Sequence, residues 1–502
     1  MRIKSGTFKK WGYYCSKKLL TFSDERRKII RIILAKGGIM SNKRFMLHFV
    51  VLAVLNMVKI IIGVFASVVA VWGVASLYFT VTGRDAPGDS ICEYLPPRFD
   101  LSPEENAYTA IKIFCDNIPT NNATLLATNY HLRKAYLDGE TNRLDLVSAV
   151  RDYLAAETAT ITAAKGILAS RGIVVEQDEV IDAAGRICTL MRIGNFYKVK
   201  AVYEASNVDL ETGRASLMEL YRVGRFLMDS DSLVYGLSAL IGDALCKTAL
   251  YTAAKEPFAP EEDEAWRVHL RNLMRNLMAD DANRWKRIAR RSFAGYTRMK
   301  VGAAAKDRKK FLAVQDDKML GALLACPGYA SYCFQPNRIL QAHRAEVDRF
   351  CRKVDEGGYD MSYARERHAG STARKAGFGP LTRNFLGQKM MPGRDDSYAS
   401  LFEMRFKSRA FIAALACRSY RAKYGKLPDC LDALVPEFLD EAPLDPYDGE
   451  KLRWNAENGY FWTKGRDGDF NGVVEFGSDG KPRLKNRTYH WVQFLDTLIP
   501  LF

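Results

Sequence analysis

Three oxygen-bearing side chains near the C-terminus have the spacing of a calcium-binding loop. Asp467, Asp469 and Asn471 alternate with other residues and precede Gly472, which gives the pattern D-x-D-x-N-G. Alternate side chains of such a loop converge on a hard cation, while the glycine permits a sharp turn. Position 12 of an EF-hand would be Ser478 instead of glutamate, which excludes a full EF-hand. The candidates to complete the site are Glu475 and Asp479. The alternative is an acidic, glycine-rich turn that binds no metal.

The other residue types that often perform chemistry are dispersed. The six histidines occur singly, at His48, His131, His269, His343, His368 and His490. His343 and Glu346 come nearest to a ligand pair, but they lack the second histidine of H-E-x-x-H, so we interpret them as surface polar residues. The chain contains no G-x-S-x-G, P-loop or G-x-G-x-x-G motif. We therefore expect no enzymatic activity. The alternative is a membrane-anchored hydrolase with a site built from dispersed residues of the region 326–395.

The element that must position everything else is the stretch Ile60–Thr82, which contains no charged residue. A helix needs about 20 apolar residues to cross the hydrocarbon core of a bilayer, so this stretch predicts a membrane span. Residues 45–58 are also apolar, but Lys59 separates them from the span. We interpret 45–58 as an interfacial segment or an extension of the same helix. A second span is less favoured because no turn residues interrupt the run.

The net charge of +16 is concentrated before this span. The first 46 residues contain 13 lysines and arginines against Asp24 and Glu25. Basic residues beside a span resist translocation, so we expect residues 1–44 to form a cytoplasmic tail and the body to lie outside the cytoplasm. The long basic lead argues for a retained anchor rather than a cleaved signal peptide. The expected partners are the lipid bilayer and envelope proteins, with no nucleic acid.

Residues 83–100 are rich in proline and glycine and predict a linker. A mainly helical domain is expected over 101–325. Apolar residues form one stripe over 142–169, which predicts a single helix there. The segments 187–205 and 212–228 predict a helix pair, and 232–255 predicts a third helix. Short turns between these helices favour antiparallel neighbours, and the pair is similar to those of tetratricopeptide arrays, although no 34-residue period is sustained.

Two further helices have identifiable signals in the sequence. Pro260, followed by four acidic residues, predicts a helix start at that proline. The basic run Arg284–Arg291 is interpreted as a solvated helix face, and Asp280 and Asp281 as residues at a helix boundary. The region 326–395 is rich in glycine, so we expect it to be irregular except for one helix over 337–354.

The ten cysteines include no C-x-x-C pair, so the sequence gives no support to a zinc ribbon or a thioredoxin-like site. Cys417 and Cys430 are a candidate disulfide, because they lie on adjacent predicted elements in an oxidising compartment. The alternative is that the cysteines are buried and unpaired.

The last part of the chain, 396–502, predicts a small α+β module. A helix of about seven turns is expected over 396–422, followed by two short aromatic strands joined at 457–459. The apolar tail 489–502 either packs on the module or docks a partner, and packing is the default.

The segment 397–470 resembles the globular half of the type II secretion major pseudopilin, as found in bacterial envelope proteins that append this module to a helical domain. The resemblance is carried by Tyr424-Gly425, Pro428, Leu431, Leu434-Val435-Pro436, Leu439, Pro443, Asp445-Pro446, Gly449, Gly459-Tyr460 and Gly465-x-Asp467-Gly468. It implies a long helix packed on a small antiparallel sheet, with calcium bound in this neighbourhood. The anchor lacks the leader, the glycine cleavage point and the early glutamate of a pseudopilin, which argues against fibre formation.

Together these observations predict a mainly α protein with a single transmembrane helix and a small α+β C-terminal domain. The resemblance implies the bacterial inner membrane, with the body in the periplasm. The expected role is that of a structural or interaction protein, associated with a type II secretion or pilus-like assembly.

Overall fold

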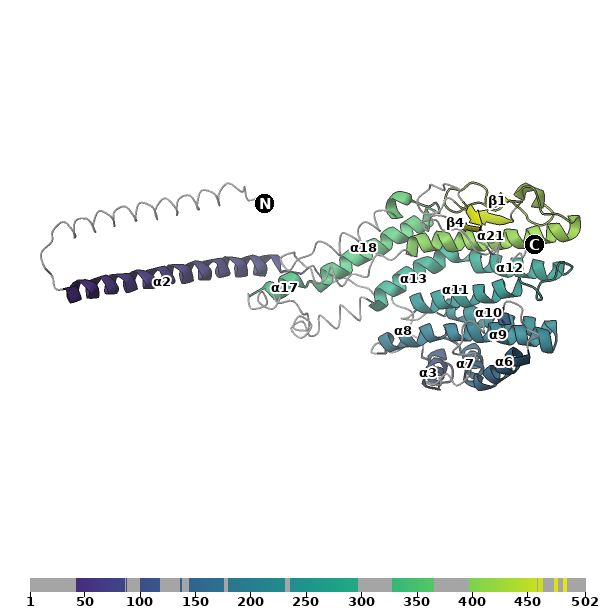
Figure 1. The fold of residues 1–502 in the computed structure, drawn as a ribbon, viewed down its shortest axis with the longest axis horizontal. Helices are drawn as coiled ribbons and strands as arrows, with labels where there is room; N and C mark the ends of the chain where they lie inside the picture. The colour runs from purple at the N-terminus through teal and green to yellow at the C-terminus, as the bar shows by residue number, and fades with distance from the viewer. Residues whose placement is uncertain are drawn as a thin grey trace. The chain divides into compact units, whose positions relative to one another are not determined.

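The computed structural model describes most of the predicted helices. The described residues are 42–85, 87, 100–117, 136–137, 144–175, 179–230, 235–296, 327–364, 397–457, 459–463, 474–476 and 482–484. The chain divides into two compact units, Met1–Leu77 and Tyr78–Phe502. The fold is mainly helical with few strands (Figure 1).

The apolar N-terminal region forms one continuous helix, α2, over Asn42–Thr82. Its part Val50–Thr82 is long and apolar enough to cross a membrane. The side chains of this part are largely exposed, as for Val71 at 70%. Residues 45–58 therefore extend the helix of the predicted span, which confirms that interpretation over a second span. The division between the two units falls within α2, so its last residues belong with the second unit.

The first helices of the second unit differ from the single helix that the apolar stripe predicted over 142–169. Two helices occupy this stretch, α6 (Leu144–Ala156) and α7 (Thr158–Ala169), and they pack with α3 (Ala107–Asn117) and α9. The break lies at Glu157, whose buried carboxylate accepts a hydrogen bond from Thr160 Oγ1 at 2.6 Å and pairs with Arg192. A buried carboxylate needs such partners, and the local break lets Glu157 reach them. The pattern of apolar residues over 142–169 gives no sign that Glu157 needs these partners.

The predicted helix pair and the helix after it are confirmed, with shifted bounds. They are α9 (Met191–Asn207), α10 (Leu210–Asp229) and α11 (Tyr235–Ala253), which lie side by side in Figure 1. A separate short helix, α8 (Val180–Thr189), ends just before α9. Asp209 caps α10 by accepting a hydrogen bond from Thr212 N at 2.7 Å.

Helices α10 and α11 touch through two glycines. A Cβ atom built on Gly242 would lie 2.5 Å from the carbonyl oxygen of Gly224, and one built on Gly224 would lie 2.6 Å from the carbonyl oxygen of Gly242. These distances are shorter than any normal van der Waals contact. The two backbones therefore approach so closely that neither position has room for a side chain.

The next helix pair is α12 (Glu264–Ala279) and α13 (Asp281–Tyr296). The predicted start at Pro260 is wrong. The N-cap is Asp263, which accepts a hydrogen bond from Trp266 N at 3.0 Å, while Pro260 lies in the preceding turn. An acidic side chain that reaches a free helix amide begins the helix more effectively than a proline without that contact. The boundary predicted at Asp280 and Asp281 is confirmed.

The interpretation of the basic run of α13 as a solvated face holds in part: Arg290 is exposed, whereas Arg284 is not. Arg284 is buried and donates a hydrogen bond to Leu277 O at 2.9 Å, and Trp285 is buried beside it. The helix predicted over 337–354 is confirmed as α18 (Pro336–Asp355), which packs on α13. Helix α13 packs against both α11 and α18, and these contacts cover part of its surface.

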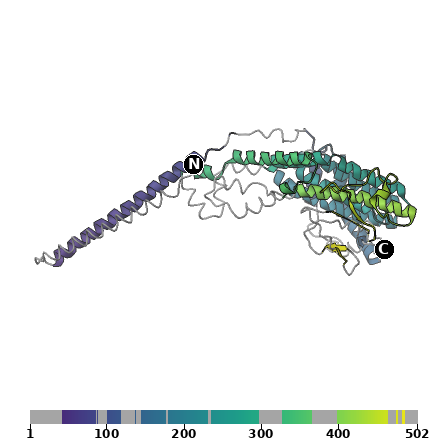
Figure 2. The same cartoon turned by 90° about the horizontal axis from the view of Figure 1, so that it is seen from above.

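The predicted long helix is confirmed as α21 (Ser397–Tyr424), and it lies beside α12 (Figures 1 and 2). A 3-10 turn, η3 (Leu431–Leu434), packs against α21. The two aromatic strands also form, as an antiparallel hairpin in which Trp454 faces Phe461. The hairpins are β1 (Arg453–Asn455) with β2 (Tyr460–Trp462), and β3 (Val474–Phe476) with β4 (Pro482–Leu484).

The candidate disulfide between Cys417 and Cys430 is wrong, because both cysteines are free. The Cys417 thiol is fully buried in α21, whereas Cys430 is exposed before η3. The alternative of buried cysteines outside disulfides holds for Cys246, Cys333, Cys351 and Cys417.

Candidate functional site

The predicted calcium ligands Asp467, Asp469 and Asn471 lie outside the described residues, as does the apolar tail 489–502. Within the described ranges, no group of three or more histidine, cysteine or acidic side chains could hold a metal ion. His343 is half-buried and packs edge-on against the Phe293 ring, with 4.6 Å between ring centroids. The histidine thus has a packing role between α18 and α13.

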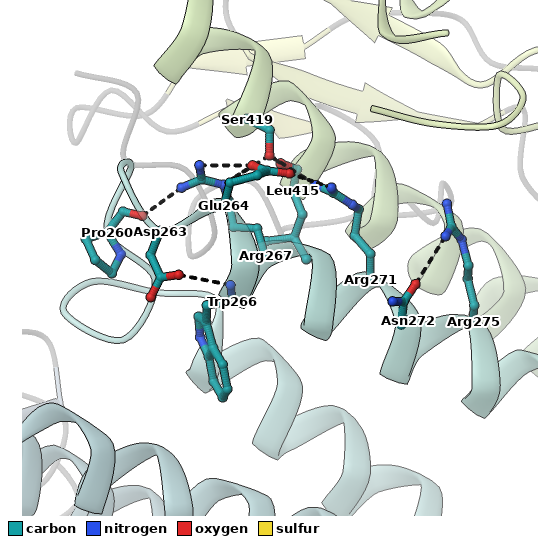
Figure 3. A network of polar contacts seen from close by, with 10 residues as sticks. All are labelled: Pro260, Asp263, Glu264, Trp266, Arg267, Arg271, Asn272, Arg275, Leu415 and Ser419. Carbon is teal, nitrogen blue, oxygen red and sulfur yellow. Dashed lines mark hydrogen bonds and ion pairs between the residues drawn. The ribbon is translucent and has the colours of Figure 1, made fainter. Parts of the chain in front are cut away.

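An extensive buried polar network joins α12 to α21 (Figure 3). Arg267 is only 1% exposed, and its Nε donates to Ser419 Oγ at 3.0 Å. Arg271, one helical turn later, donates Nη1 to the same oxygen at 3.0 Å and Nη2 to Glu264 Oε1 at 2.7 Å. The Ser419 hydroxyl in turn donates a hydrogen bond to Leu415 O at 3.0 Å. One serine therefore accepts hydrogen bonds from two buried guanidinium groups.

The charge of this network is balanced by Glu264. Burial alone would raise the pKa of this carboxyl group, but the neighbouring Ser419 hydroxyl, the hydrogen bond from Arg271 and the charges of Arg271 and Arg267 outweigh it and lower the pKa. Arg267 also donates to Glu264 Oε2 at 3.1 Å and to Pro260 O at 2.7 Å. The ionised form of Glu264 is therefore the one that the fold stabilises.

Two more buried arginines secure the turn before α12. Arg418 donates Nη1 to Ala254 O at 2.6 Å and Nη2 to Glu256 at 2.8 Å. Arg214 donates Nη2 to Asp263 at 2.6 Å, and its guanidinium carbon lies 4.4 Å from the centroid of the Trp266 ring. These cations make hydrogen bonds inside the protein: Arg418 ties α21 to the chain just after α11, and Arg214 ties α10 to the start of α12. A ligand-binding role is not required to explain them.

A groove opens where the third arginine of this face of α12, Arg275, follows Arg271 by one turn. Its volume is about 470 Å³. The lining comes from α12, α21 and the loop after η3, and consists of Arg275, Met278, Ala279, Arg409, Ile412, Leu439, Asp440, Glu441, Pro443 and Leu444. The groove thus has an apolar floor between two arginines and two acidic residues.

The two arginines of the groove are held differently from the buried ones. Arg275 is only loosely paired with Asp440, at 3.7 Å. Arg409 donates Nη1 to Leu444 O at 2.7 Å, and burial, with the nearby Arg405 charge, lowers its pKa. The Arg275 side chain is 41% exposed and also donates to Asn272 at 3.3 Å, so both guanidinium groups can offer N–H donors to a carboxylate in the groove. The groove therefore suits an apolar side chain next to an acidic group.

The loop that forms one wall of the groove is fixed by Asp445. Its side chain is 0% exposed and accepts hydrogen bonds from Arg453 Nη1 at 2.7 Å, Thr463 Oγ1 at 2.9 Å and Tyr447 N at 3.0 Å. Burial raises the pKa of this carboxyl group despite these bonds. The groove wall is thereby tied to the β1–β2 hairpin.

Comparison of the chain with protein-family models, curated proteins and solved structures gave no match. The groove and the arginine network therefore rest on the geometry alone.

Sequence reasoning identified neither the groove nor the arginine network. A signal was present, because Arg267, Arg271 and Arg275 recur every four residues and so share one helix face. The burial of Arg267 and Arg271 depends on α21, which follows more than a hundred residues later in the chain. No local pattern in the sequence of α12 predicts its contact with α21.

Proposed function

We propose that this chain is a membrane-anchored interaction protein whose body binds a segment of a protein partner in the groove between α12, α21 and the loop 439–444. The observation that carries the proposal is the composition of the groove, an apolar floor flanked by Arg275 and Arg409. Its lining contains no serine, threonine, cysteine, histidine or lysine. Such a surface suits binding better than nucleophilic or acid-base chemistry.

The expected occupant is a segment with an apolar side chain and a neighbouring carboxylate. The floor of the groove offers Met278, Ile412 and Leu444 to the apolar group, and the arginines offer charged donors to the carboxylate. Burial of the apolar group would supply affinity, while the arginines would supply orientation and specificity.

The setting of this interaction is proposed from the sequence. The basic tail favours a cytoplasmic N-terminus, and the resemblance of 397–470 to the pseudopilin module favours a bacterial inner membrane with the body in the periplasm. A partner from a type II secretion or pilus-like assembly fits this setting. Calcium binding by Asp467, Asp469 and Asn471 also stays a prediction.

Site-specific photo-crosslinking in living cells tests the proposal. A benzophenone amino acid at Leu444, in the groove, is expected to form a covalent protein adduct, whereas the same probe at the exposed Val208 is not. Arg275→Glu should abolish the adduct, while the matched exposed change Arg222→Glu should leave it intact. Equal adducts at both probe positions, or an adduct that survives Arg275→Glu, would contradict the proposal. Repeating the capture with calcium and with a chelator tests the calcium prediction.

A further inference from the structure

The end of α2 is covered by a segment that lies about 245 residues further along the chain. Phe79 is only 6% exposed, whereas Val71 is 70% exposed. The Phe79 ring lies 5.0 Å from the Tyr329 ring and 4.9 Å from the Tyr332 ring, measured between centroids. Both tyrosines belong to the short helix α17 (Tyr329–Cys333). We call residues 328–338, which include α17 and the start of α18, the collar.

Backbone contacts show that the collar is closely fitted to α2. Gly328 has a φ of 80°, and a Cβ atom at this position would lie 2.5 Å from Thr80 Oγ1 and 2.6 Å from Thr80 N. A Cβ atom on Gly83 would lie 2.9 Å from Tyr332 N. Glycine is required at 328 both for the positive φ and for this close approach.

Polar contacts close the ends of both helices. Gln335 Nε2 donates to Thr82 O at 3.0 Å and so satisfies a carbonyl group at the C-terminal end of α2. The Asp85 carboxylate accepts hydrogen bonds from Asn337 N at 2.9 Å and Arg338 N at 3.1 Å. A carboxylate at the first turn of α18 also favours the helix dipole. The exit from α2 is thus folded against the collar over 82–85, a stretch that the proline and glycine content predicted to be part of a linker.

The length of the charge-free helix places the collar relative to a bilayer. From Ile60, the first residue after Lys59, to Leu77, the helix is about 27 Å long at 1.5 Å per residue, close to the hydrocarbon thickness of about 30 Å. Leu77 is 67% exposed, whereas in the next turn the collar covers the face of Phe79 and leaves Val81 57% exposed. A hydrocarbon core that extends over Ile60–Leu77 would therefore end at the turn where the collar first contacts α2.

The chemistry of this region suits the interface between lipid and water. Tyrosine favours this layer because its ring is apolar and its hydroxyl group is polar, and Tyr78 is exposed beside the buried ring of Tyr332, with centroids 5.7 Å apart. Arg338, the last residue of the collar, is exposed in the first turn of α18. An arginine at this depth meets lipid phosphate.

We propose that the collar rests on the phospholipid headgroups at the end of the span, with Tyr78 in the interfacial layer and Arg338 toward lipid phosphate. The region 326–395 thereby gains a role, since its N-terminal part contacts the C-terminal end of α2. The proposal depends on α2 spanning a membrane, which is part of the proposed function.

Depth measurements on the full chain test the collar. The chain is reconstituted into vesicles of phosphatidylethanolamine and phosphatidylglycerol, with a single nitroxide label at Ser331, Val71 or Val208 in a background without other reactive cysteines. Relative accessibility to oxygen and to a water-soluble nickel complex gives the depth of each label. We expect Val71 to be deep in the bilayer, Val208 to be in water and Ser331 to be at the headgroup level.

The three labels separate the two ways in which the reasoning could fail. A Ser331 label as accessible to nickel as the Val208 label, with Val71 still deep, would overturn the collar and leave the anchor intact. A Val71 label in water would overturn the anchor itself. Phe79→Ala should shift the Ser331 label toward water, whereas Val64→Ala, at an exposed position of the span, should leave its depth unchanged. A Ser331 depth that is indifferent to Phe79→Ala would show that the Phe79 contact does not hold the collar, and would overturn it.

Discussion

The close contact between α10 and α11 makes a single methyl group a sharp test of the fold. In Gly242→Ala, the new Cβ atom would lie 2.5 Å from Gly224 O and 2.8 Å from a carbon of the Met228 side chain. The Met228 backbone nitrogen, at 2.9 Å, blocks a third direction. Backbone atoms cannot rotate away, so the two helices must separate along their length.

The cost follows from two opposing effects. Overpacking of a well-packed interior costs about 1–3 kcal/mol. Replacing a helical glycine by alanine gains up to about 1 kcal/mol, because alanine loses less backbone entropy on folding. Because the new Cβ atom meets backbone atoms at 2.5 and 2.9 Å, we expect the cost at the upper end of its range, about 2–3 kcal/mol, and hence a net loss of about 1–2 kcal/mol in the free energy of unfolding for Gly242→Ala.

Gly185 in α8 offers a matched control, since a Cβ atom there meets nothing within 4 Å. Gly185→Ala should therefore raise stability by up to about 1 kcal/mol. Thermal unfolding of the full chain in one detergent, followed by circular dichroism, measures both changes as shifts in Tm of opposite sign. A Gly242→Ala protein at least as stable as Gly185→Ala would refute the close helix contact.

Three further outcomes are expected. Ser419→Ala removes the acceptor that two buried guanidinium groups share, and should lower stability by about 1–3 kcal/mol, read as a lower Tm. Because the pKa of Glu264 is lowered in the folded protein, its ionised carboxylate contributes stability above its ordinary pKa of about 4.3, and this contribution is lost as the pH falls through the folded-state pKa. Glu264→Gln should therefore make the decline of Tm in acid less steep. Burial raises the pKa of the Cys246 and Cys417 thiols, so a maleimide at neutral pH should label exposed Cys430 in the native protein, and Cys246 and Cys417 only after unfolding. Labelling of Cys417 at the native rate of Cys430 would contradict the packing of α21.

The sequence predicted the elements whose signals are local. Periodicity located the helix pair α9 and α10, and the charge-free run located α2, because both patterns repeat along a single element. The alternation of aromatic residues with turn residues likewise located the hairpin of β1 and β2. In each case neighbouring residues contained the whole signal.

The features that the sequence did not predict depend on distant partners. Glu157 breaks a helical stripe because it pairs with Arg192, 35 residues later, and Arg267 is buried where it reaches Ser419, 152 residues later. The groove requires α12 and the loop 439–444 to meet, although they are far apart in the chain. Periodicity within one helix cannot show which charged residues a later segment will cover.

The contact between Phe79 and the collar can form only late in the synthesis of the chain. The residues that cover the exit of α2 are made about 245 residues after it, which corresponds to roughly 12–50 s at 5–20 residues per second. During that interval the nascent chain exposes the apolar ring of Phe79 and an open helix end. Ribosomes that stop before Gly328 would release a polypeptide in which the C-terminal end of α2 is never covered by the collar. Such fragments would be targets for quality-control proteases.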